Sequence, residues 1–295
     1  MSLRKEKRRE TIYAYGFLLP SLLLFSIFLF YPMARSIYYS LHLTDPRGQI
    51  AMFVGFENFV RIFTDSGFYV SLLATAKFML LTVPTCIFVA LVLAVLSHNK
   101  LRGMGAFQWI FSMPVVISVA TGSAIWLLLF HPSIGMLNYF LGLIGIEPIY
   151  WLVDPNWALV SVSLVTVWMN IGFAFIVLLG GLKGIPPDIY ESSTIDGAGP
   201  MTTLWRITFP MLSPTLLFLV VISIINAFQA FGQIHILTKG GPLRSTEVVV
   251  YSIYQDAFVN FQFGTASAKA IVLFAIILLL TLIQFAMAEK KVHYQ

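Results

Sequence analysis

Polar side chains recur at helical spacing within two otherwise apolar runs of the sequence. Each run carries three of them at positions i, i+3 and i+7, so a helix would present each set as one stripe. A polar side chain costs free energy in hydrocarbon and therefore tends to face protein or water. The residues are Ser163, Thr166, Asn170, Asn226, Gln229 and Gln233.

Two interpretations of these stripes are open. In the first, the side chains form hydrogen bonds between neighbouring helices, each contributing ~0.6–2 kcal/mol. In the second, they line a pathway whose amide donors and acceptors bind the hydroxyl groups of a polyol or sugar. The nearby rings of Trp168, Phe228 and Phe231 could stack on a sugar face or simply pack in the core. The amides assigned to the pathway are Asn170, Asn226, Gln229 and Gln233.

Lys77, within the apolar run SLLATAKFMLL, offers a different chemistry. It lies about two helical turns, ~10 Å, inside the end of the run that we assign below to the outer side. Its flexible stem could carry the ammonium out to the lipid headgroups. Alternatively, the ammonium turns inward and attracts an anionic solute near the outer mouth of a pathway, because a point charge suits phosphate without bidentate geometry.

The composition indicates which elements position these residues. Of 295 residues, 58% are hydrophobic and 11% are charged, and the mean hydropathy is +0.86. So few charges cannot cover a water-soluble globule of this size, and a helix that crosses a bilayer needs about 20 apolar residues. We therefore predict an all-α polytopic membrane protein with six spanning helices. The expected spans lie near residues 12–34, 70–97, 106–130, 157–180, 212–236 and 266–288.

The basic tail RKEKRRE before the first span resembles the start of a secretory signal. However, the run from Ile12 to Met33 is longer than a usual signal core of about 7–15 residues and no small-x-small cleavage site follows it, so we expect a retained helix. The single cysteine, Cys86, excludes an internal disulfide and a cysteine-based metal cage. The five histidines lack metal-ligand spacing, and no metal site is expected.

The distribution of Lys and Arg predicts the orientation. Six crossings put both termini on one side, and the positive-inside rule assigns the side with more Lys and Arg to the cytoplasm. The net charge of +5 then reflects topology, and no nucleic-acid partner is expected. Eleven of the 18 basic residues fall on the side of the termini: Arg4, Lys5, Lys7, Arg8, Arg9, Lys100, Arg102, Lys183, Arg206, Lys290 and Lys291.

The largest cytoplasmic loop, residues 181–211, contains the polar stretch YESSTIDGAGP. The preceding IPPD favours a helix start, because proline at the first positions needs no backbone donor. Gly197 and Gly199 can adopt the left-handed or turn geometry that stops this helix. Pro200 opens a second helix, PMTTLWRITF, which we expect Pro210 to end at the membrane.

In the second helix of this loop, four residues at positions i, i+3, i+4 and i+7 share one side of the helix. The first three are apolar and the fourth is a threonine. They predict one face that points toward cytosol or headgroups. This face fits an amphipathic connector in the interfacial layer, and it also fits a docking element for a soluble partner. The residues are Met201, Leu204, Trp205 and Thr208.

The spacing of the anchor residues favours docking. A glutamate, a glycine, an isoleucine and a proline follow one another with five, nine and two intervening residues. This pattern resembles the EAA loop of ABC importer permeases, although two serines and Phe209 stand where that loop has two alanines and a leucine. The resemblance implies ATPase coupling by Glu191, Ser192, Ser193, Asp196, Gly197, Ile207 and Pro210.

The resemblance extends over nearly the whole chain, to permeases of carbohydrate-type ABC importers. It rests on LLPSLLLF, FYPMARSIYYSL, VGFENFVRIF, SMPVVISVATGSAIWLLLFHPSIGMLN and LTKGGPLRSTEVVVYSIYQDAF. With the ending EKKVHYQ, the chain is most similar to the first permease of sn-glycerol-3-phosphate importers. The family implies a type I importer permease fold with residues 1–11 as a cytoplasmic tail, 12–288 as the permease domain, 184–210 as its coupling loop and 289–295 as a second tail.

The same resemblance implies the partners. They are a second permease, two ATP-binding subunits and an extracytoplasmic solute-binding protein, in a bacterial inner membrane. The chain lacks the G-x-x-x-x-G-K-[ST] phosphate loop, so ATP and Mg²⁺ are expected in the separate ATPase subunits, and this chain is expected to be neither an enzyme nor a cofactor protein. The alternatives are a neutral mono- or oligosaccharide cargo, or an ion-coupled secondary transporter, which usually carries ionisable residues at mid-membrane.

Overall fold

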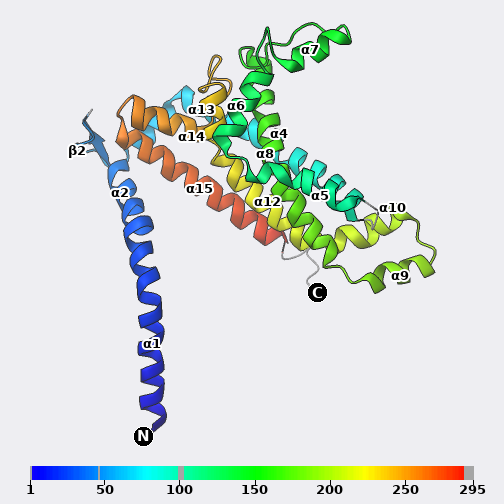
Figure 1. Cartoon of the computed structure of the whole chain (residues 1–295). Coiled ribbons are helices and arrows are strands. Elements are labelled where there is room, and N and C mark those ends of the chain that lie inside the picture. Colours follow the sequence, from blue (N-terminus) through cyan, green and yellow to red (C-terminus); the bar gives the residue numbers. More distant parts are fainter. Residues whose placement is uncertain (1, 46, 99–102, 289–295) are drawn as a thin grey trace. The chain divides into compact units, whose positions relative to one another are not determined.

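A computed structural model describes residues 2–45, 47–98 and 103–288, which are largely helical (Figure 1). Contacts divide the chain into two units, Met1–Asp65 with Ile253–Leu273, and Ser66–Ser252 with Phe274–Gln295. The elements up to residue 143 are α1 (Ser2–Phe25), η1 (Ser26–Phe30), α2 (Tyr31–Ser40), β1 (His42–Thr44), β2 (Ile50–Phe53), α3 (Glu57–Thr64), α4 (Ser66–His98), α5 (Met104–Ser112), η2 (Met113–Val116), α6 (Val119–Leu129) and α7 (Met136–Leu143). The later elements are α8 (Pro155–Lys183), α9 (Pro187–Ile195), α10 (Pro200–Thr203), η3 (Leu204–Thr208), α11 (Phe209–Met211), α12 (Ser213–Phe228), α13 (Gly232–Leu237), α14 (Val249–Tyr254), η4 (Gln255–Val259) and α15 (Phe263–Ala288).

The first unit contains a small antiparallel hairpin after its N-terminal helical segment. β1 pairs with β2, and His42 lies opposite Phe53. The Asp45 carboxylate accepts hydrogen bonds from the backbone N–H groups of Arg47 at 3.0 Å and Gln49 at 2.7 Å, and these bonds shape the turn. The expectation of an all-α chain is therefore wrong for this short hairpin, which lies outside the expected spans.

Asn58 of α3 fastens the hairpin within the first unit. Its side-chain amide donates to the backbone oxygens of Ser40 at 2.9 Å and His42 at 3.0 Å. Gly264 of α15 approaches the same region, because its N–H lies 3.3 Å from Thr44 Oγ1 and a Cβ there would collide with the His42 oxygen. Only glycine permits so close an approach.

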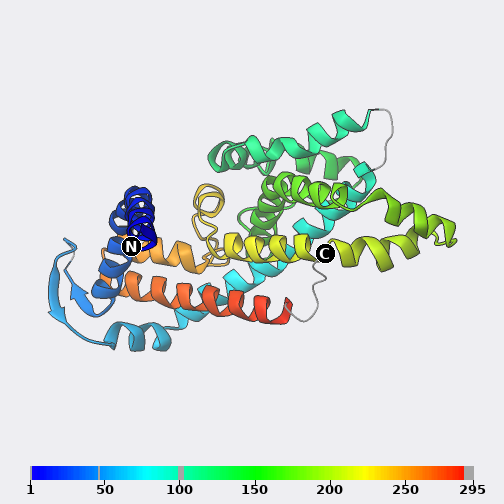
Figure 2. The same ribbon diagram turned by 90° about the horizontal axis from the view of Figure 1, so that it is seen from below.

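The second unit is built on α4, α8 and α12, which pack along one another in Figures 1 and 2. Ala90 and Ala94 of α4 are fully buried, and the large side chains of Phe175, Leu178 and Leu219 fill the space between the helices. Small residues on one helix allow a close approach of its neighbours, which is how helices associate in a bilayer without a hydrophobic driving force.

Four helices are long and apolar enough to cross a membrane: Tyr13–Ser40, Ser66–His98, Pro155–Lys183 and Phe263–Met287. Two bent pairs raise the number to six within the described residues if each pair is one span. These four continuous helices cover the first, second, fourth and sixth spans expected from the sequence. In the first of them, Tyr13–Ser40, no residue of the most apolar 18-residue window is buried.

The third expected span is a bent pair rather than a straight helix. Its two parts, α5 with η2 and α6, meet at 103°. Ile117 is extended, and the Ser118 hydroxyl then caps α6 by accepting a hydrogen bond from the Thr121 N–H at 3.2 Å. Gly172 of α8 lets the bend approach, because a Cβ there would lie 2.9 Å from the Ser112 oxygen.

The expectation of one continuous fifth helix near 212–236 is wrong. α12 ends at Phe228, and residues 229–231 leave helical geometry before α13 begins. Gly232 lies so close to α6 that a Cβ would be 2.9 Å from Val119 Cγ1, so the chain bends to make this approach and glycine permits it. At its other end, α12 meets the segment from α10 to α11 at 65°.

Candidate functional site

A cavity of about 320 Å³ lies among α4, α8, α12 and α13. All four amides that the sequence assigns to a pathway line it. Asn170 comes from α8, Asn226 from the last turn of α12, Gln229 from the end of that helix and Gln233 from α13. The first three side chains are exposed, and Gln233 is buried at 8% exposure. The fold thus gathers these amides on one cavity.

Thr166 of α8 connects two of the amides. Gln233 Nε2 donates to the Thr166 hydroxyl at 3.2 Å, and Asn170 Nδ2 donates to the Thr166 backbone oxygen at 2.9 Å. The hydroxyl itself donates to the Val162 oxygen at 2.8 Å. Because both side-chain NH₂ groups bond to the protein, the carbonyl oxygens of the two amides can accept hydrogen bonds from hydroxyl donors in the cavity.

The spacing argument that grouped these residues holds only in part. Gln233 lies on α13, beyond the break, and therefore does not belong to the same helical stripe as Asn226. Ser163 does not line the cavity, since its hydroxyl donates to the Leu159 oxygen of its own helix at 2.7 Å. Bending of the chain, rather than helical periodicity, brings Gln233 to the cavity.

Thr82 and Cys86 also line the cavity from α4, together with Ser223 from α12. They were not predicted as site residues, because small polar side chains in an apolar helix usually bond to the backbone of their own helix. The i, i+4 spacing of Thr82 and Cys86 is the one sequence signal that could have indicated that α4 lines the cavity. The lining side chains carry no formal charge, so the cavity offers hydrogen bonds and apolar contact.

The three aromatic residues near the stripes lie in different surroundings. Phe231 lines the cavity and stacks on His235, with ring centroids 5.3 Å apart. Phe228 is buried at 5% exposure, and Trp168 packs edge-on against Trp126 at 5.8 Å. Of the three rings, only Phe231 is placed where it could contact a solute in this cavity.

Lys77 does not line the amide cavity. It lies on α4 beside a different cavity, which the start of α8 and the loop before α14 also line. The structure therefore separates the lysine from the four amides. Among the residues that the structure describes, no group of three or more His, Cys, Asp or Glu side chains could hold a metal ion.

The loop of residues 181–211 forms the expected pair of short helices. α9 begins at Pro187, and Asp196 follows its last residue. Gly197 then has φ +75°, the left-handed geometry predicted for it, and its N–H donates to the Thr194 oxygen at 3.1 Å. The Ala198 N–H donates to the Ser193 oxygen at 2.9 Å, and this pair of bonds is a Schellman cap that stops the helix.

The other anchor residues of the loop lie on or near this cap. Glu191, Ser192 and Asp196 are exposed, whereas Ser193 is buried and its hydroxyl donates to the Tyr190 oxygen at 2.8 Å. Several of them border one groove of about 510 Å³ between α9 and the second short helix. Of the residues that the sequence assigns to ATPase coupling, four line this groove: Ser192, Ser193, Asp196 and Ile207.

Two expectations for the second short helix need correction. The helix does not end at Pro210 but continues to Met211, and a π-helical turn at Leu204–Thr208 changes its periodicity. Thr208 is therefore buried at 5% exposure instead of sharing an exposed face with Met201 and Trp205. A π-turn inserts an extra residue into the helix and rotates the following side chains.

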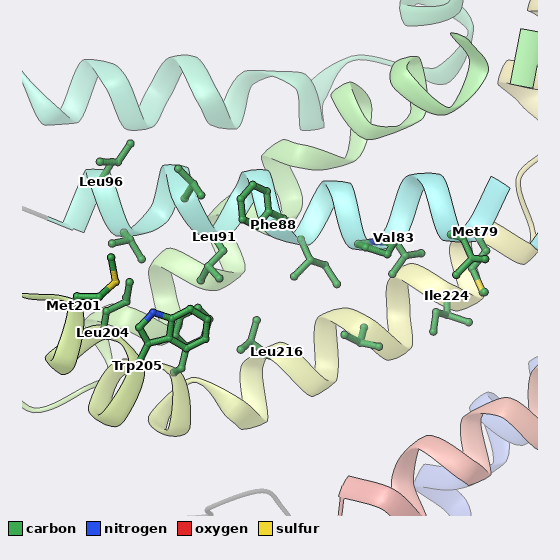
Figure 3. Close-up of a pocket in the computed structure, with 17 residues that line it drawn as sticks. Met79, Val83, Phe88, Leu91, Leu96, Met201, Leu204, Trp205, Leu216 and Ile224 are labelled. Atoms are coloured by element: carbon green, nitrogen blue, oxygen red, sulfur yellow. The ribbon is translucent and has the colours of Figure 1, made fainter. Parts of the chain in front are cut away.

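The apolar face of this helix borders a groove of the chain itself (Figure 3). Leu204 and Trp205 point toward Leu91 of α4 across a groove of about 780 Å³ that runs between α4 and α12. The Trp205 ring also stacks on Phe209, with centroids 4.7 Å apart. The expectation that this face points toward cytosol or headgroups is thus incomplete, because its apolar side chains couple the loop to two long helices.

Comparisons with known proteins agree with this architecture. Residues 56–293 match the family described as binding-protein-dependent transport system inner membrane component. The sn-glycerol-3-phosphate transport system permease protein UgpA of Agrobacterium fabrum is 36% identical over 286 residues, with 96% of this chain and 97% of the relative covered. UgpA of Pectobacterium atrosepticum is 33% identical over 290 residues, with 97% of each chain covered.

Solved structures give the same result at the level of the fold. A bacterial alginate ABC transporter, determined in complex with an alginate pentasaccharide-bound periplasmic protein, contains a chain with a TM-score of 0.82 and 26% identity that covers 98% of both chains. The family match covers most of the sequence, and the relatives match it end to end. This chain therefore belongs to the family of binding-protein-dependent transport system inner membrane components.

Proposed function

We propose that this chain is a permease subunit of an ATP-driven importer whose cargo is sn-glycerol-3-phosphate or a closely related polyol phosphate. The observation that carries the proposal is the collection of four amides on one cavity among helices that can cross a membrane. Amide oxygens and NH₂ groups match the donors and acceptors of a polyol. The named cargo of the relatives, sn-glycerol-3-phosphate, is a polyol phosphate.

A second cargo class is favoured by one feature of the cavity. Its lining side chains carry no formal charge, so a neutral mono- or oligosaccharide would meet the same hydrogen-bonding groups without an unpaired charge. The two cargo classes differ in the phosphate. An anionic cargo would need cations from outside the amide cavity, on this chain or on another subunit.

The assembly follows from the family. Solute-binding protein and other ABC subunits are expected around this chain, and we propose one second permease and two ATP-binding subunits that hold ATP and Mg²⁺. The coupling loop, residues 184–210, would insert into the ATPase. ATP-driven closure would then favour the outward-facing state, because a ligand shifts an equilibrium only by preferring one state.

The topology belongs to the same proposal. We propose six spans within residues 12–288 and both termini in the cytoplasm. The bent pair of Met104–Val116 and Val119–Leu129 would form the third span, and Ser213–Phe228 would form most of the fifth. The excess of Lys and Arg on the side of the termini supports this orientation. The tails would be residues 1–11 and 289–295, and the last of these lie outside the described residues.

Replacing Asn170 or Gln233 by alanine is expected to lower solute uptake about threefold to tenfold with little loss of folded protein. Each change removes an amide that would bond to the cargo, and one hydrogen bond contributes about 0.5–1.5 kcal/mol. Uptake of labelled sn-glycerol-3-phosphate and of common oligosaccharides into proteoliposomes containing the assembled importer measures the effect. The same assay on Asn226→Ala and Gln229→Ala tests the other wall.

Ser163→Ala is the matched control. It removes a polar group from α8 that bonds within its own helix and does not line the cavity, so uptake should be unchanged. If uptake and thermal stability fall together in the amide variants, the amides are interhelical hydrogen-bonding groups and the pathway assignment is wrong. Altered preference among cargoes at normal stability would support the assignment.

A further inference from the structure

A second cavity, of about 500 Å³, lies where α4 meets the start of α8 and the loop before α14. Four polar residues line it: Lys77 of α4, Asn156 of α8, and Arg244 with Ser245 of the loop. The rest of its lining is apolar, mainly leucine and valine side chains. Both charged residues that line this cavity are cations.

Two of these polar groups have no hydrogen-bond or ion-pair partner among the residues that the structure describes. Lys77 forms no ion pair or hydrogen bond with the residues that the structure describes, although it lies within a candidate spanning helix. The Ser245 hydroxyl is buried, and no described group is hydrogen-bonded to it. The Lys77 side chain is exposed on the surface of this chain, but an ammonium within a spanning helix is costly to leave unpaired, and so is a buried hydroxyl.

The third group, Arg244, is held in a fixed position. Its Nε donates to Glu247 Oε2 at 2.7 Å and its Nη2 to Glu247 Oε1 at 2.6 Å, a bidentate pair, and Nη2 also lies 3.3 Å from the Gly67 oxygen. Ser71 donates to the same carboxylate at 3.3 Å. The Glu247 carboxylate compensates the Arg244 charge and orients the guanidinium, so Arg244 could donate a further N–H at little cost in side-chain entropy.

Two carboxylates near this cavity do not pair with Lys77. Glu247 is bonded to Arg244 and Ser71, and Asp154 accepts from the backbone and side-chain N–H groups of Asn156 at 2.8 Å and 3.2 Å. Neither carboxylate lines the cavity. An anion in this cavity would compensate the Lys77 charge, which no described carboxylate pairs with.

We propose that this cavity binds a phosphate group through Lys77, with Arg244 and the Ser245 hydroxyl as further donors. A phosphate supplies several acceptor oxygens for these groups, and an ammonium binds it as a point charge. The phosphate could belong to a membrane lipid, whose chains would lie on the apolar walls, or to a soluble phosphate monoester. The site is separate from the amide cavity and does not depend on the proposed cargo.

Binding is tested with the full chain, purified with its co-purifying subunits in an alkyl maltoside detergent, which carries no phosphate. One arm titrates sn-glycerol-3-phosphate by calorimetry. The other arm adds phosphatidylglycerol and measures its retention by native mass spectrometry. We expect Lys77→Met to weaken one of the two probes about tenfold, as loss of a charge-assisted hydrogen bond does, and Lys77→Arg to retain most of the affinity.

Lys239→Met is the matched control. It removes a cation from the loop that carries Arg244, at a position that does not line the cavity. Selective loss of phosphatidylglycerol in Lys77→Met assigns the site to a lipid headgroup, and selective loss of sn-glycerol-3-phosphate assigns it to a soluble monoester. If neither probe distinguishes Lys77→Met from Lys239→Met, the site does not exist. Because the readout is binding, failure of uptake or of energy coupling does not affect the result.

Discussion

Replacing Gly197 by proline is expected to abolish ATP-coupled uptake while the membrane helices remain inserted. Gly197 has φ +75°, and its N–H completes the cap of α9. Proline holds φ near −65° and has no N–H, so the cap cannot form. The exposed anchors Glu191 and Asp196 would then leave the positions that the coupling loop requires, although no long helix is touched.

Uptake, ATPase stimulation and co-purification of the ATPase subunits measure this effect together. We expect uptake to fall at least about tenfold, because rebuilding the lost cap in a strained form costs on the order of 1–3 kcal/mol. Glu191→Arg should give the same loss by reversing an exposed charge at the proposed ATPase contact. Normal uptake with normal ATPase stimulation in both variants would remove the coupling assignment.

Gly199 provides the matched control for Gly197. Both glycines are exposed, and a Cβ at either would meet no atom within 4 Å. They differ in the backbone, since Gly199 has φ −73°, which any residue adopts. Gly197→Ala should therefore weaken coupling measurably, whereas Gly199→Ala should not, and equal effects of the two changes would contradict a role for the left-handed turn.

The sequence predicted those features of the fold that depend on local chemistry. Hydropathy located the apolar helices because each must be apolar along its own length. Pro187 and the cap at Gly197 were predictable because a proline start and a left-handed glycine are local effects. Gly199 was expected to share that turn geometry, but it is extended, since one left-handed residue suffices to stop the helix.

The bends were not predictable, because their causes lie in distant parts of the chain. Gly232 approaches Val119 of α6, and Gly172 of α8 admits the Ser112 oxygen. Hydropathy does not register such pairs, since both partners are apolar or backbone. The hairpin was missed for a related reason: its strands have three and four residues, too few to show an alternation.

The candidate site was likewise predictable only where its features depend on local sequence. The amides were found because polar groups stand out in hydrocarbon, yet Gln233 reaches the cavity through a chain break rather than through the spacing used to predict it. Thr82 and Cys86 were missed because a single small polar residue in an apolar helix usually bonds to its own backbone. Lys77 was singled out because it is a cation within an apolar run, but its cavity could not be foreseen.

A buried ion pair in the first unit was also not foreseen. Lys269 lies within the last expected span, near 266–288, and no partner was predicted for it. In the structure its Nζ lies 2.6 Å from Asp256 Oδ2, and the two side chains are only 5% and 14% exposed. Asp256 belongs to η4, and the turn between η4 and α15 brings the carboxylate back onto the helix.

Lys269→Met is expected to destabilise the protein by about 3–5 kcal/mol, because it leaves the Asp256 carboxylate buried without its counter-charge. Asp256→Leu should be similarly harmful. The double variant should recover most of the lost stability, since two apolar side chains need no compensation in this environment. Thermal unfolding in one detergent, followed by fluorescence and by loss of monodisperse protein, measures all three variants.

Arg61→Met is the control for this experiment. It shows whether the loss of stability in Lys269→Met comes from burial of the ion pair or merely from removal of a positive charge. Arg61 pairs with Glu57 at 3.4 Å in the same unit, but its side chain and that of Glu57 are 50% and 59% exposed. Water already solvates such a pair, so its loss should cost less than about 1 kcal/mol. If Lys269→Met is as mild as Arg61→Met, or if the double variant is no more stable than either single one, the pair is solvated in the assembled membrane protein and does not hold η4 against α15.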